Sequence, residues 1–407
     1  METIILFTEA FPYGKNEAFL ESEIIYLSKR FKKIYIIPNT PSGELRLLPA
    51  NCEVVSSEVQ FHPEEKMRHY ILANIIKLFK YYISLVCVSR DRLYYIKNFF
   101  LVLSELAMAL EESKIYFSLF KKYLSETSIL YFYWYRRPFL NFAILKAEKK
   151  VNHKLISRAH GWDYDPQQNP LGFYPYREIE LKQTDKLVVT CSWGADLEKK
   201  LFPQYASRIS FSYLGVHDGQ MINPTNATNC FHLVSCSTVW EIKRVDLIIE
   251  ILKNIDFDLT WTHIGDGPML NEIKSKSLVL PSKVICEFLG HKNNSDILDY
   301  YKNNPCDLFI NVSRNEGLPV SMMEAISYGI PVMGTNVGGV SELVNEKTGF
   351  LIEKEFDPKE VALMISHYCS KPLEEKNQLR KSAREYFLLH FNAEMNYNNF
   401  INDYLLT

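Results

Sequence analysis

Two glutamates eight positions apart stand out in the stretch RNEGLPVSMMEAISYGIPV, residues 314–332. Glu316 precedes a Gly-Leu-Pro turn, and Glu324 falls inside the segment that the turn opens. The apolar run before the turn, CDLFINVS, predicts a central strand over 306–313. Pro319 suits the first turn of a helix, because its missing N–H needs no acceptor there. The sequence therefore predicts a strand, a tight loop that carries one acid, and a helix that carries another.

Such a helix start suits an anionic ligand. Backbone N–H groups around Gly317 and Leu318, together with the helix dipole, would form a phosphate site that glycine lets a ligand approach closely. A carboxylate repels phosphate, so we expect Glu316 to face neutral hydroxyl groups on the same ligand. Glu324, about one helical turn further, would accept hydrogen bonds from a ribose diol. The alternative, a capping acid and a solvated acid, does not explain the Gly-Leu-Pro turn.

Short apolar runs alternate with helical stretches along the whole chain, which is typical of parallel, doubly wound α/β sheets. A chain of 407 residues is too long for one ordinary core, so two domains are expected. The polar stretch VHDGQMINPTNATNC, residues 216–230, reads as the linker. We expect a first domain over 1–215 and a second over 216–391. A last helix, over about 392–407, would cross back onto the first domain.

Composition limits the classes of partner. The formal net charge of −2 gives no general affinity for nucleic acid. Residues 1–217 hold 29 Lys and Arg against 23 Asp and Glu. This excess suggests an anionic partner, such as a membrane surface or a phosphorylated acceptor, although ordinary surface charge explains it equally well. The eight cysteines are scattered, without CxxC pairs or clustered histidines, so neither a zinc site nor a disulfide scaffold is expected.

We expect no signal peptide, because METIILFTEAF lacks a basic n-region and its apolar run is short. No apolar run approaches about 20 uninterrupted residues, so no membrane-spanning segment is expected. One segment comes closer to a membrane role: ILANIIKLFKYYISLVCVSR, residues 71–90. It is a basic amphipathic helix that could lie in a lipid interface, or a core-packing helix with Lys77 and Lys80 in solvent. Both interpretations stay open. The expected location is the cytoplasm, with the inner face of the cell membrane as a variant.

The motifs resemble those of retaining glycosyltransferases with the GT-B architecture, above all family 4 and its bacterial O-antigen and capsule enzymes. Glu316 and Glu324 match the family's E-x7-E motif. Over residues 205–390 the segments GVHD, KRVDLII, HIGDGP, FLGH, GIPVMGTNVGGVSELV and TGFLI follow in family order. The first half is matched only by FPYGKNEAFLESEI (11–24) and SRAHGWD (157–163). The resemblance implies two Rossmann-like domains that face each other across a cleft.

The resemblance also implies a nucleotide-sugar donor, with UDP and GDP both open. Glu316 would contact the hydroxyl groups of the donor sugar, and Glu324 the ribose. Lys243 would neutralise the leaving diphosphate. The resemblance also implies that the backbone amides of Gly317, Leu318 and Val320 hold the diphosphate. Gly265 would lie near the nucleotide, and the backbone near Leu289 and Gly290 would recognise the base.

One part of the family pattern is missing. The family often has Gly-Arg where this chain has Ser237 and Thr238, so one phosphate-binding cation is absent from its usual place. Arg244 replaces the usual glycine after Lys243, and it is the candidate to compensate.

In the first domain, His160 matches the family's cleft histidine, although a lone histidine is more often a satisfied core residue. Gly14 matches a loop near the acceptor and the diphosphate. The stretch YFYWYRRPFL suggests an acceptor site at Tyr133, Arg136 and Arg137, because aromatic rings stack on sugars and arginine pairs with phosphate. A lipid-linked oligosaccharide would use both. A core strand with two surface arginines is the equally weighted alternative.

The family reaction is transfer by front-face attack, in which the leaving phosphate takes the acceptor's proton. It implies no protein nucleophile, no metal and no cofactor, and we read the Asp-x-Asp sequences at 163–165 and 256–258 as chance. Two other functions stay open: a nucleotide-sugar epimerase on the same scaffold, and a non-catalytic donor-binding subunit of a polysaccharide assembly complex. The Glu316 and Glu324 motif favours transfer.

Overall fold

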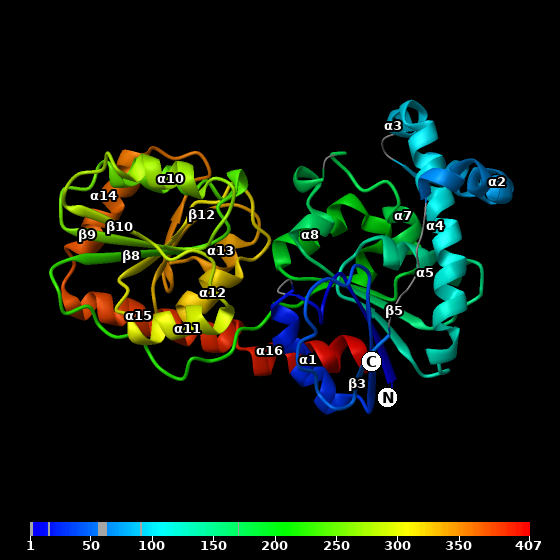
Figure 1. Ribbon diagram of the computed structural model, residues 1–407, viewed down its shortest axis with the longest axis horizontal. Coiled ribbons are helices and arrows are strands. Elements are labelled where there is room, and N and C mark those ends of the chain that lie inside the picture. Colours follow the sequence, from blue (N-terminus) through cyan, green and yellow to red (C-terminus); the bar gives the residue numbers. More distant parts are fainter. Residues whose placement is uncertain (1–2, 15–16, 56–62, 90–91, 170) are drawn as a thin grey trace. The chain divides into compact units, whose positions relative to one another are not determined.

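The computed structural model describes residues 3–14, 17–55, 63–89, 92–169 and 171–407 (Figure 1). The chain divides into two compact units. The first unit comprises residues 1–190, 194–212 and 398–407, and the second unit comprises residues 191–193 and 213–397.

The first unit is built on a seven-stranded parallel sheet in the order β3-β2-β1-β4-β5-β6-β7. Its central strands are continuous apolar runs, as strands covered by helices on both faces require, and Ile4, Ile5 and Leu6 are fully buried. The strand order reverses between β1 and β4, so loops that follow these two strands meet at a switch point. The strands are β1 (Thr3–Thr8), β2 (Lys33–Pro38), β3 (Cys52–Val54), β4 (Ile129–Phe132), β5 (Lys154–Ala159), β6 (Lys186–Val189) and β7 (Ile209–Phe211).

Helices α2 (Pro63–Val88), α3 (Arg92–Lys97) and α4 (Phe99–Phe120) form an elongated group at one side of this unit (Figure 1). They share an apolar cluster with α5, in which Leu78 of α2, Leu106 of α4 and Ile144 of α5 are buried. The other helices of the unit are α1 (Phe19–Arg30), α5 (Arg137–Ala147), α6 (Gly161–Tyr164), α7 (Arg177–Gln183) and α8 (Ser192–Leu201), whose first two residues belong to the second unit.

One helix differs from the sequence-based expectation. Met67–Val88 is long and apolar enough to cross a membrane. Only 17% of its 18-residue apolar stretch is buried. Length and composition alone do not distinguish a spanning helix from other apolar helices. The low burial does show that α2 is not a core-packing helix. It packs along one stripe against α4 and exposes the opposite stripe.

The second unit contains a six-stranded parallel sheet in the order β10-β9-β8-β11-β12-β13, which reverses between β8 and β11. With the first sheet, it confirms the expected α/β class with two doubly wound sheets. The strands are β8 (Phe231–Cys236), β9 (Leu259–Ile264), β10 (Val284–Phe288), β11 (Leu308–Asn311), β12 (Val332–Thr335) and β13 (Gly349–Ile352). The helices are α9 (Val245–Leu252), α10 (Leu270–Ser277), α11 (Asn294–Asn303), α12 (Val320–Ser327), α13 (Val340–Leu343), α14 (Pro358–Cys369), α15 (Leu373–His390) and α16 (Ala393–Phe400).

The end of the chain packs in the first unit from residue 398 onward, although α16 begins in the second. The Phe400 ring lies 3.7 Å from the guanidinium carbon of Arg158 and 5.4 Å from the ring of Tyr131. Tyr404 donates a hydrogen bond of 3.1 Å to the Phe211 carbonyl. The chain enters the second unit at residue 213, two residues beyond β7.

Candidate active site

Lys243 and Glu316 meet at the switch point of the second sheet. Lys243 ends a short 3-10 turn after β8, and Glu316 lies in the loop after β11. The Lys243 Nζ donates to Glu316 Oε1 at 2.6 Å. The same oxygen accepts from Ser313 Oγ at 2.7 Å and from Asn311 Nδ2 at 3.1 Å. Burial acts to raise the pKa of Glu316, but the Lys243 charge and these three donors outweigh it and lower the pKa.

Helix α12 begins directly after this loop. Pro319 is its N-cap residue rather than part of its first turn, and Val320 is the first helical residue. The N–H groups of the first turn have no intrahelical acceptor, so the helix presents donors and a positive dipole end beside Glu316. A helix start of this kind is where the sequence predicts an anion site.

Glu324 lies on the second turn of α12 and is buried. The Asn294 side chain, at the start of α11, donates to Glu324 Oε1 at 2.5 Å. Burial raises the pKa of Glu324 to about 7, although the Asn294 hydrogen bond opposes this shift. The two acids of the motif therefore differ in charge behaviour: Glu316 is held ionised by a cation, whereas Glu324 titrates near neutrality.

A second loop packs backbone to backbone against the Glu316 loop. The Gly339 N–H donates to the Gly317 carbonyl at 2.8 Å. Gly338 has φ +54°, and a Cβ there would lie 1.8 Å from the Glu316 carbonyl oxygen. Glycine is therefore required at 338 for both its backbone conformation and the close approach.

The loops after β9 and β10 also touch through glycine. The Gly265 N–H donates to the Gly290 carbonyl at 2.9 Å, and the Leu289 N–H donates to the His263 carbonyl at 3.0 Å. A Cβ on Gly265 would lie 1.8 Å from the Ser237 carbonyl oxygen. Gly265, Leu289 and Gly290 thus lie together at the carboxyl edge of the sheet.

Arg244 adopts the left-handed conformation, with φ +47° and ψ +38°. This explains why glycine is usual at the position. Its guanidinium donates to the carbonyls of Val312 at 2.8 Å and Lys354 at 2.8 Å, and it is buried. The side chain holds the end of β11 in place, an arrangement that supports a structural role for Arg244 rather than the expected phosphate contact.

In the first unit, His160 follows β5 and caps α6. Its Nε2–H donates to the Tyr133 carbonyl at 3.1 Å, because a carbonyl can only accept. The ring centroid lies 4.5 Å from that of Trp134 and 4.7 Å from that of Tyr133. Burial, then the charges of Arg158 and Arg136, lowers the pKa of His160 to about 3. His160 is therefore neutral at physiological pH, with Nδ1 as a hydrogen-bond acceptor.

Gly14 lies in the loop after β1, with φ +62°. Its N–H donates to the Glu44 carbonyl at 2.9 Å, and its carbonyl accepts from Arg46 Nε at 2.6 Å. Lys15 and Asn16 of the same turn lie outside the described residues.

The loop after β1 is organised by Glu17, a residue that sequence reasoning missed. Its carboxylate accepts from the N–H groups of Glu9 at 3.0 Å, Ala10 at 2.7 Å and Phe11 at 2.6 Å. It also accepts from Trp134 Nε1, after β4, at 2.5 Å. Glu17 thus joins the loops on both sides of the first sheet's switch point.

The expected acceptor residues are not equivalent. Tyr133 has no exposed surface, so its ring offers no face for stacking, and this part of the prediction is corrected. Arg137 is paired with Glu105 and, at 3.6 Å, with Glu112. Arg136 is 42% exposed, pairs with the buried Asp163 at 3.0 Å and lies over the Trp134 ring.

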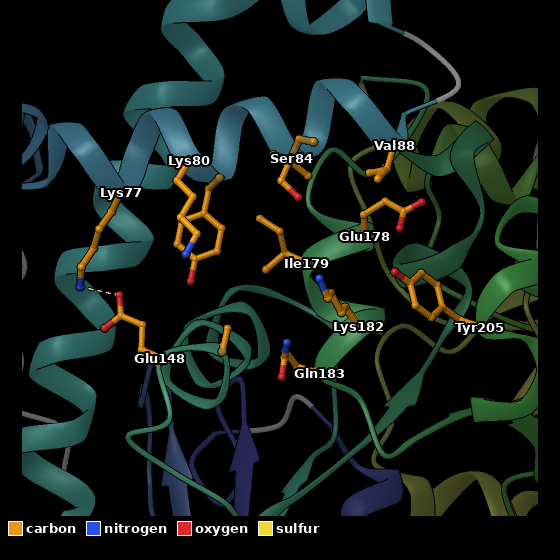
Figure 2. Close-up of a pocket in the computed structure, with 13 residues that line it drawn as sticks. Lys77, Lys80, Ser84, Val88, Glu148, Glu178, Ile179, Lys182, Gln183 and Tyr205 are labelled. Atoms are coloured by element: carbon orange, nitrogen blue, oxygen red, sulfur yellow. Dashed lines mark hydrogen bonds and ion pairs between the residues drawn. The ribbon is translucent and has the colours of Figure 1, made fainter.

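The first unit contains two cavities, of which one touches expected site residues. One of about 380 Å³ is lined by Arg136, Arg137 and Trp162, among others. A larger groove of about 630 Å³ lies between α2 and helices α5 and α7 (Figure 2), and its lining includes none of the expected site residues. Among the described residues, no group of three or more His, Cys, Asp or Glu side chains gathers as a metal site would require.

Most of the second unit matches a protein-family model. Residues 228–386 match the model described as Glycosyl transferases group 1, and this range includes Lys243, Glu316 and Glu324. Residues 228–386 are therefore similar to a group 1 glycosyl transferase domain. The group 1 domain accounts for the sheet, the α12 helix start and the loops that pack around them.

Curated relatives match part of the chain. An uncharacterized glycosyltransferase of Methanocaldococcus jannaschii is 25% identical over 243 residues, which are 60% of this chain and 64% of that protein. An Escherichia coli enzyme, UDP-Gal:alpha-D-GlcNAc-diphosphoundecaprenol alpha-1,3-galactosyltransferase, is 31% identical over 134 residues, 31% of this chain and 33% of that one. The alignments thus span less than two thirds of these relatives.

Among solved structures, the Anabaena protein HepE in complex with UDP matches over 100% of both chains with a TM-score of 0.64 and 15% identity. This likeness concerns the fold, and it confirms that the chain has the two-domain GT-B fold. The group 1 domain is the second of the two.

Three residues of the group 1 domain were not identified as site residues from the sequence. Gly338 and Gly339 lie within the quoted motif GIPVMGTNVGGVSELV, so a signal for them existed. Asn294 lies in a polar stretch, KNNSD, without any such signal, and only the fold brings it to Glu324.

Proposed function

We propose that the chain is a retaining glycosyltransferase that moves a sugar from a UDP-sugar or GDP-sugar to a growing, lipid-linked glycan of a bacterial surface polysaccharide. The observation that carries the proposal is the Lys243 and Glu316 pair at the second sheet's switch point, beside the start of α12. The E. coli relative, named for a UDP-sugar donor and a diphosphate-linked acceptor, and the UDP complex of the Anabaena protein support the same chemistry.

In the proposed step, the bond between the anomeric carbon and the diphosphate oxygen breaks, and the acceptor hydroxyl forms a new bond on the same face of the sugar. The hydroxyl proton passes to the leaving phosphate oxygen. The protein supplies no nucleophile. Its contribution is to stabilise the charge that develops on the leaving diphosphate and to position the reactants.

Lys243 is the proposed cation for that charge. Because Ser237 and Thr238 replace the family's usual Gly-Arg and the Arg244 guanidinium donates to backbone carbonyls, we assign this role to Lys243 rather than to either of these positions. The N–H groups of Gly317, Leu318 and Val320 add donors and the helix dipole.

Glu316 has two tasks in this proposal. Without donor it holds Lys243 at 2.6 Å. With donor, Lys243 would turn to the phosphates, and Ser313 and Asn311 would keep Glu316 in place to accept from the sugar hydroxyls. The ion pair thus gives each of the two partly buried charges a partner of opposite sign.

Glu324 would accept hydrogen bonds from the ribose, which stabilise its ionised form and lower its pKa from about 7. Gly265 would lie near the nucleotide, and the backbone at Leu289 and Gly290 near the base. In the first unit, neutral His160 would bind a donor hydroxyl through Nδ1, and the Gly14 loop would lie near the acceptor.

We propose Arg136, with the cavity beside it, as the acceptor's phosphate contact, and leave out Tyr133 and Arg137 because one is buried and the other is paired with two acids. We propose no metal and no cofactor, because Lys243 and the α12 start supply the charge. The reaction would take place in the cytoplasm, at the inner face of the membrane that carries the acceptor lipid.

The test has two stages. Calorimetry and thermal shift against UDP, GDP and their common sugars identify the donor, since a ligand of the native state raises its stability by mass action. Transfer to a synthetic GlcNAc-diphospho-lipid is then followed by NMR of the new anomeric proton. We expect a product with the donor's anomeric configuration, and a loss of about 100-fold or more in kcat for Lys243→Ala.

Lys253→Ala is the matched control, because Lys253 forms an exposed pair with Glu250 in the same unit. An inverted product would overturn the retaining step. An altered free sugar without acceptor would identify an epimerase. Donor binding without any turnover, with Lys243→Ala harmless to polysaccharide assembly in cells, would identify a non-catalytic subunit.

A further inference from the structure

Helix α2 exposes an apolar stripe along its length. Leu72, Ile76, Phe79 and Ile83 are all exposed, Ile76 to 84%, and their spacing of four, three and four places them on one helical face. The opposite stripe, which includes Leu78 and Leu85, is buried against α4. The two stripes show that α2 has one face for the protein and another that the first unit does not cover.

The exposed stripe continues onto α3 and the start of α4. Leu93, Ile96 and Phe100 are exposed, Phe100 to 82%. The Phe99 ring joins the two parts, because its centroid lies 6.4 Å from that of Phe79 and 5.2 Å from that of Phe100. We call these seven exposed side chains the apolar surface: Leu72, Ile76, Phe79, Ile83, Leu93, Ile96 and Phe100.

Basic residues outnumber acidic ones in the segment that carries the apolar surface. Residues 67–101 contain six Lys and Arg and one Asp. An exposed apolar patch of this size marks an interaction site, and a basic border favours an anionic partner. A water-soluble acidic protein would satisfy the charge but would leave four apolar side chains on a single helix face without a matching groove.

The groove behind α2 adds cations to the same helix. Lys80 points from α2 into this groove, opposite Lys182 of α7 (Figure 2). Lys77 forms an ion pair with Glu148 at 2.5 Å. Among the described residues, no carboxylate lies within ion-pair distance of Lys80 or Lys182. Anionic groups at the edge of α2 would therefore meet lysines that are not already neutralised.

We propose that the apolar surface docks the first unit onto an anionic lipid bilayer. The helices lie in the interface, with the apolar surface in the acyl boundary and Lys80, Arg92 and Lys97 at the level of the lipid phosphates. Spanning is disfavoured for two reasons. A spanning α2 would place Lys77 and Lys80 in hydrocarbon. It would also separate the buried stripe of α2, which includes Leu78 and Leu85, from α4. This inference does not depend on the proposed donor or reaction.

The experiment is flotation of the purified full chain with vesicles of phosphatidylcholine alone or with about one third phosphatidylglycerol. We expect binding to the anionic vesicles that is about tenfold or more tighter and that weakens as salt is raised from 0.05 to 0.5 M. The double variant Ile76→Ser/Phe100→Ser should lose about tenfold or more in affinity, since each side chain leaves apolar surroundings.

The matched control is Leu363→Ser/Leu389→Ser, which alters two leucines of the second unit that are 69% and 68% exposed. It should bind vesicles as the unaltered chain does, and circular dichroism should show all variants folded. Lys80→Gln/Lys97→Gln should lose the preference for anionic over neutral vesicles but keep the residual binding to both.

Three results would overturn the proposal. The unaltered chain could fail to float with either vesicle. The Ile76→Ser/Phe100→Ser variant could float unchanged. Sedimentation could show a concentration-dependent dimer that this variant abolishes, without vesicle binding, in which case the apolar surface is an interface between copies of the chain.

Discussion

The Lys243 Nζ lies 2.6 Å from Glu316 Oε1, across the point where the strand order of the second sheet reverses. The two residues are 73 positions apart, and each follows one of the two central strands. A cation and an acid that are both expected to contact the donor thus neutralise each other in its absence. The pair gives each of the two partly buried charges a partner of opposite sign.

Lys243→Met should lower the free energy of unfolding by about 1–3 kcal/mol, because Glu316 would stay mostly buried without its cation. Denaturant unfolding measures this change. Lys253→Met, which breaks an exposed pair, should stay within about 0.5 kcal/mol of the unaltered protein. Equal effects of the two variants would show that the Lys243 pair is no stronger than a surface pair.

Arg244→Gly tests whether backbone strain or hydrogen bonding dominates at a left-handed residue. Glycine would relieve about 1–2 kcal/mol of strain, but the guanidinium's bonds to the Val312 and Lys354 carbonyls are worth about 1.5–3 kcal/mol each. We therefore expect a net loss of about 1–5 kcal/mol in the free energy of unfolding.

Gln220→Gly is the matched control for Arg244→Gly. Gln220 has φ +57° and is exposed, so glycine removes strain there without removing a buried side chain. The control should be unchanged or stabilised by up to about 1 kcal/mol. Nucleotide affinity of Arg244→Gly should stay within about threefold of the unaltered chain. A loss of tenfold or more in nucleotide affinity would indicate that Arg244 contacts the phosphate.

Glu324 should make stability depend on pH near neutrality. Its pKa is raised to about 7 from 4.5, so its contribution is fully present below about pH 4.5 and is lost as the pH rises through 7. Relative to the unaltered protein, Glu324→Gln should therefore gain stability between pH 5 and 8, by about 3 kcal/mol at full effect. Unfolding at several pH values measures the difference, and a flat difference would contradict the raised pKa.

Glu17→Gln should destabilise the first unit by about 2–3 kcal/mol, because an amide would replace a carboxylate that accepts from three backbone N–H groups and from Trp134. Hydrogen exchange of the Ala10 and Phe11 amides should accelerate most. Glu126→Gln, at an exposed position, should change stability by less than about 0.5 kcal/mol. Unchanged exchange at Ala10 and Phe11 would show that the loop does not depend on Glu17.

Local patterns predicted the architecture well. Continuous apolar runs of four to six residues became buried strands, and the Gly-Leu-Pro turn after β11 became a helix start. These features depend on neighbours in sequence, so periodicity and turn chemistry suffice to find them. The E-x7-E motif was found for the same reason, since both acids lie on one strand-loop-helix segment.

The missed features all depend on contacts between distant segments. Glu17 meets Trp134 from 117 positions away, and Arg244 turns inward because carbonyls of two other loops accept from it. The sequence of α2 could not show which side would be covered, because that depends on how α4 packs. Tyr133 was misread because a ring at the end of a strand is exposed or buried according to the loops that follow neighbouring strands.

The return of residues 398–407 to the first unit has a consequence for synthesis of the protein. Phe400 and Tyr404 pack on Arg158, Tyr131 and Phe211, which leave the ribosome about 190 residues or more before them. During translation, the second unit can complete its sheet while the first still lacks this covering segment. Buried Arg158 would meanwhile face water, so the first unit to emerge is the last to be finished.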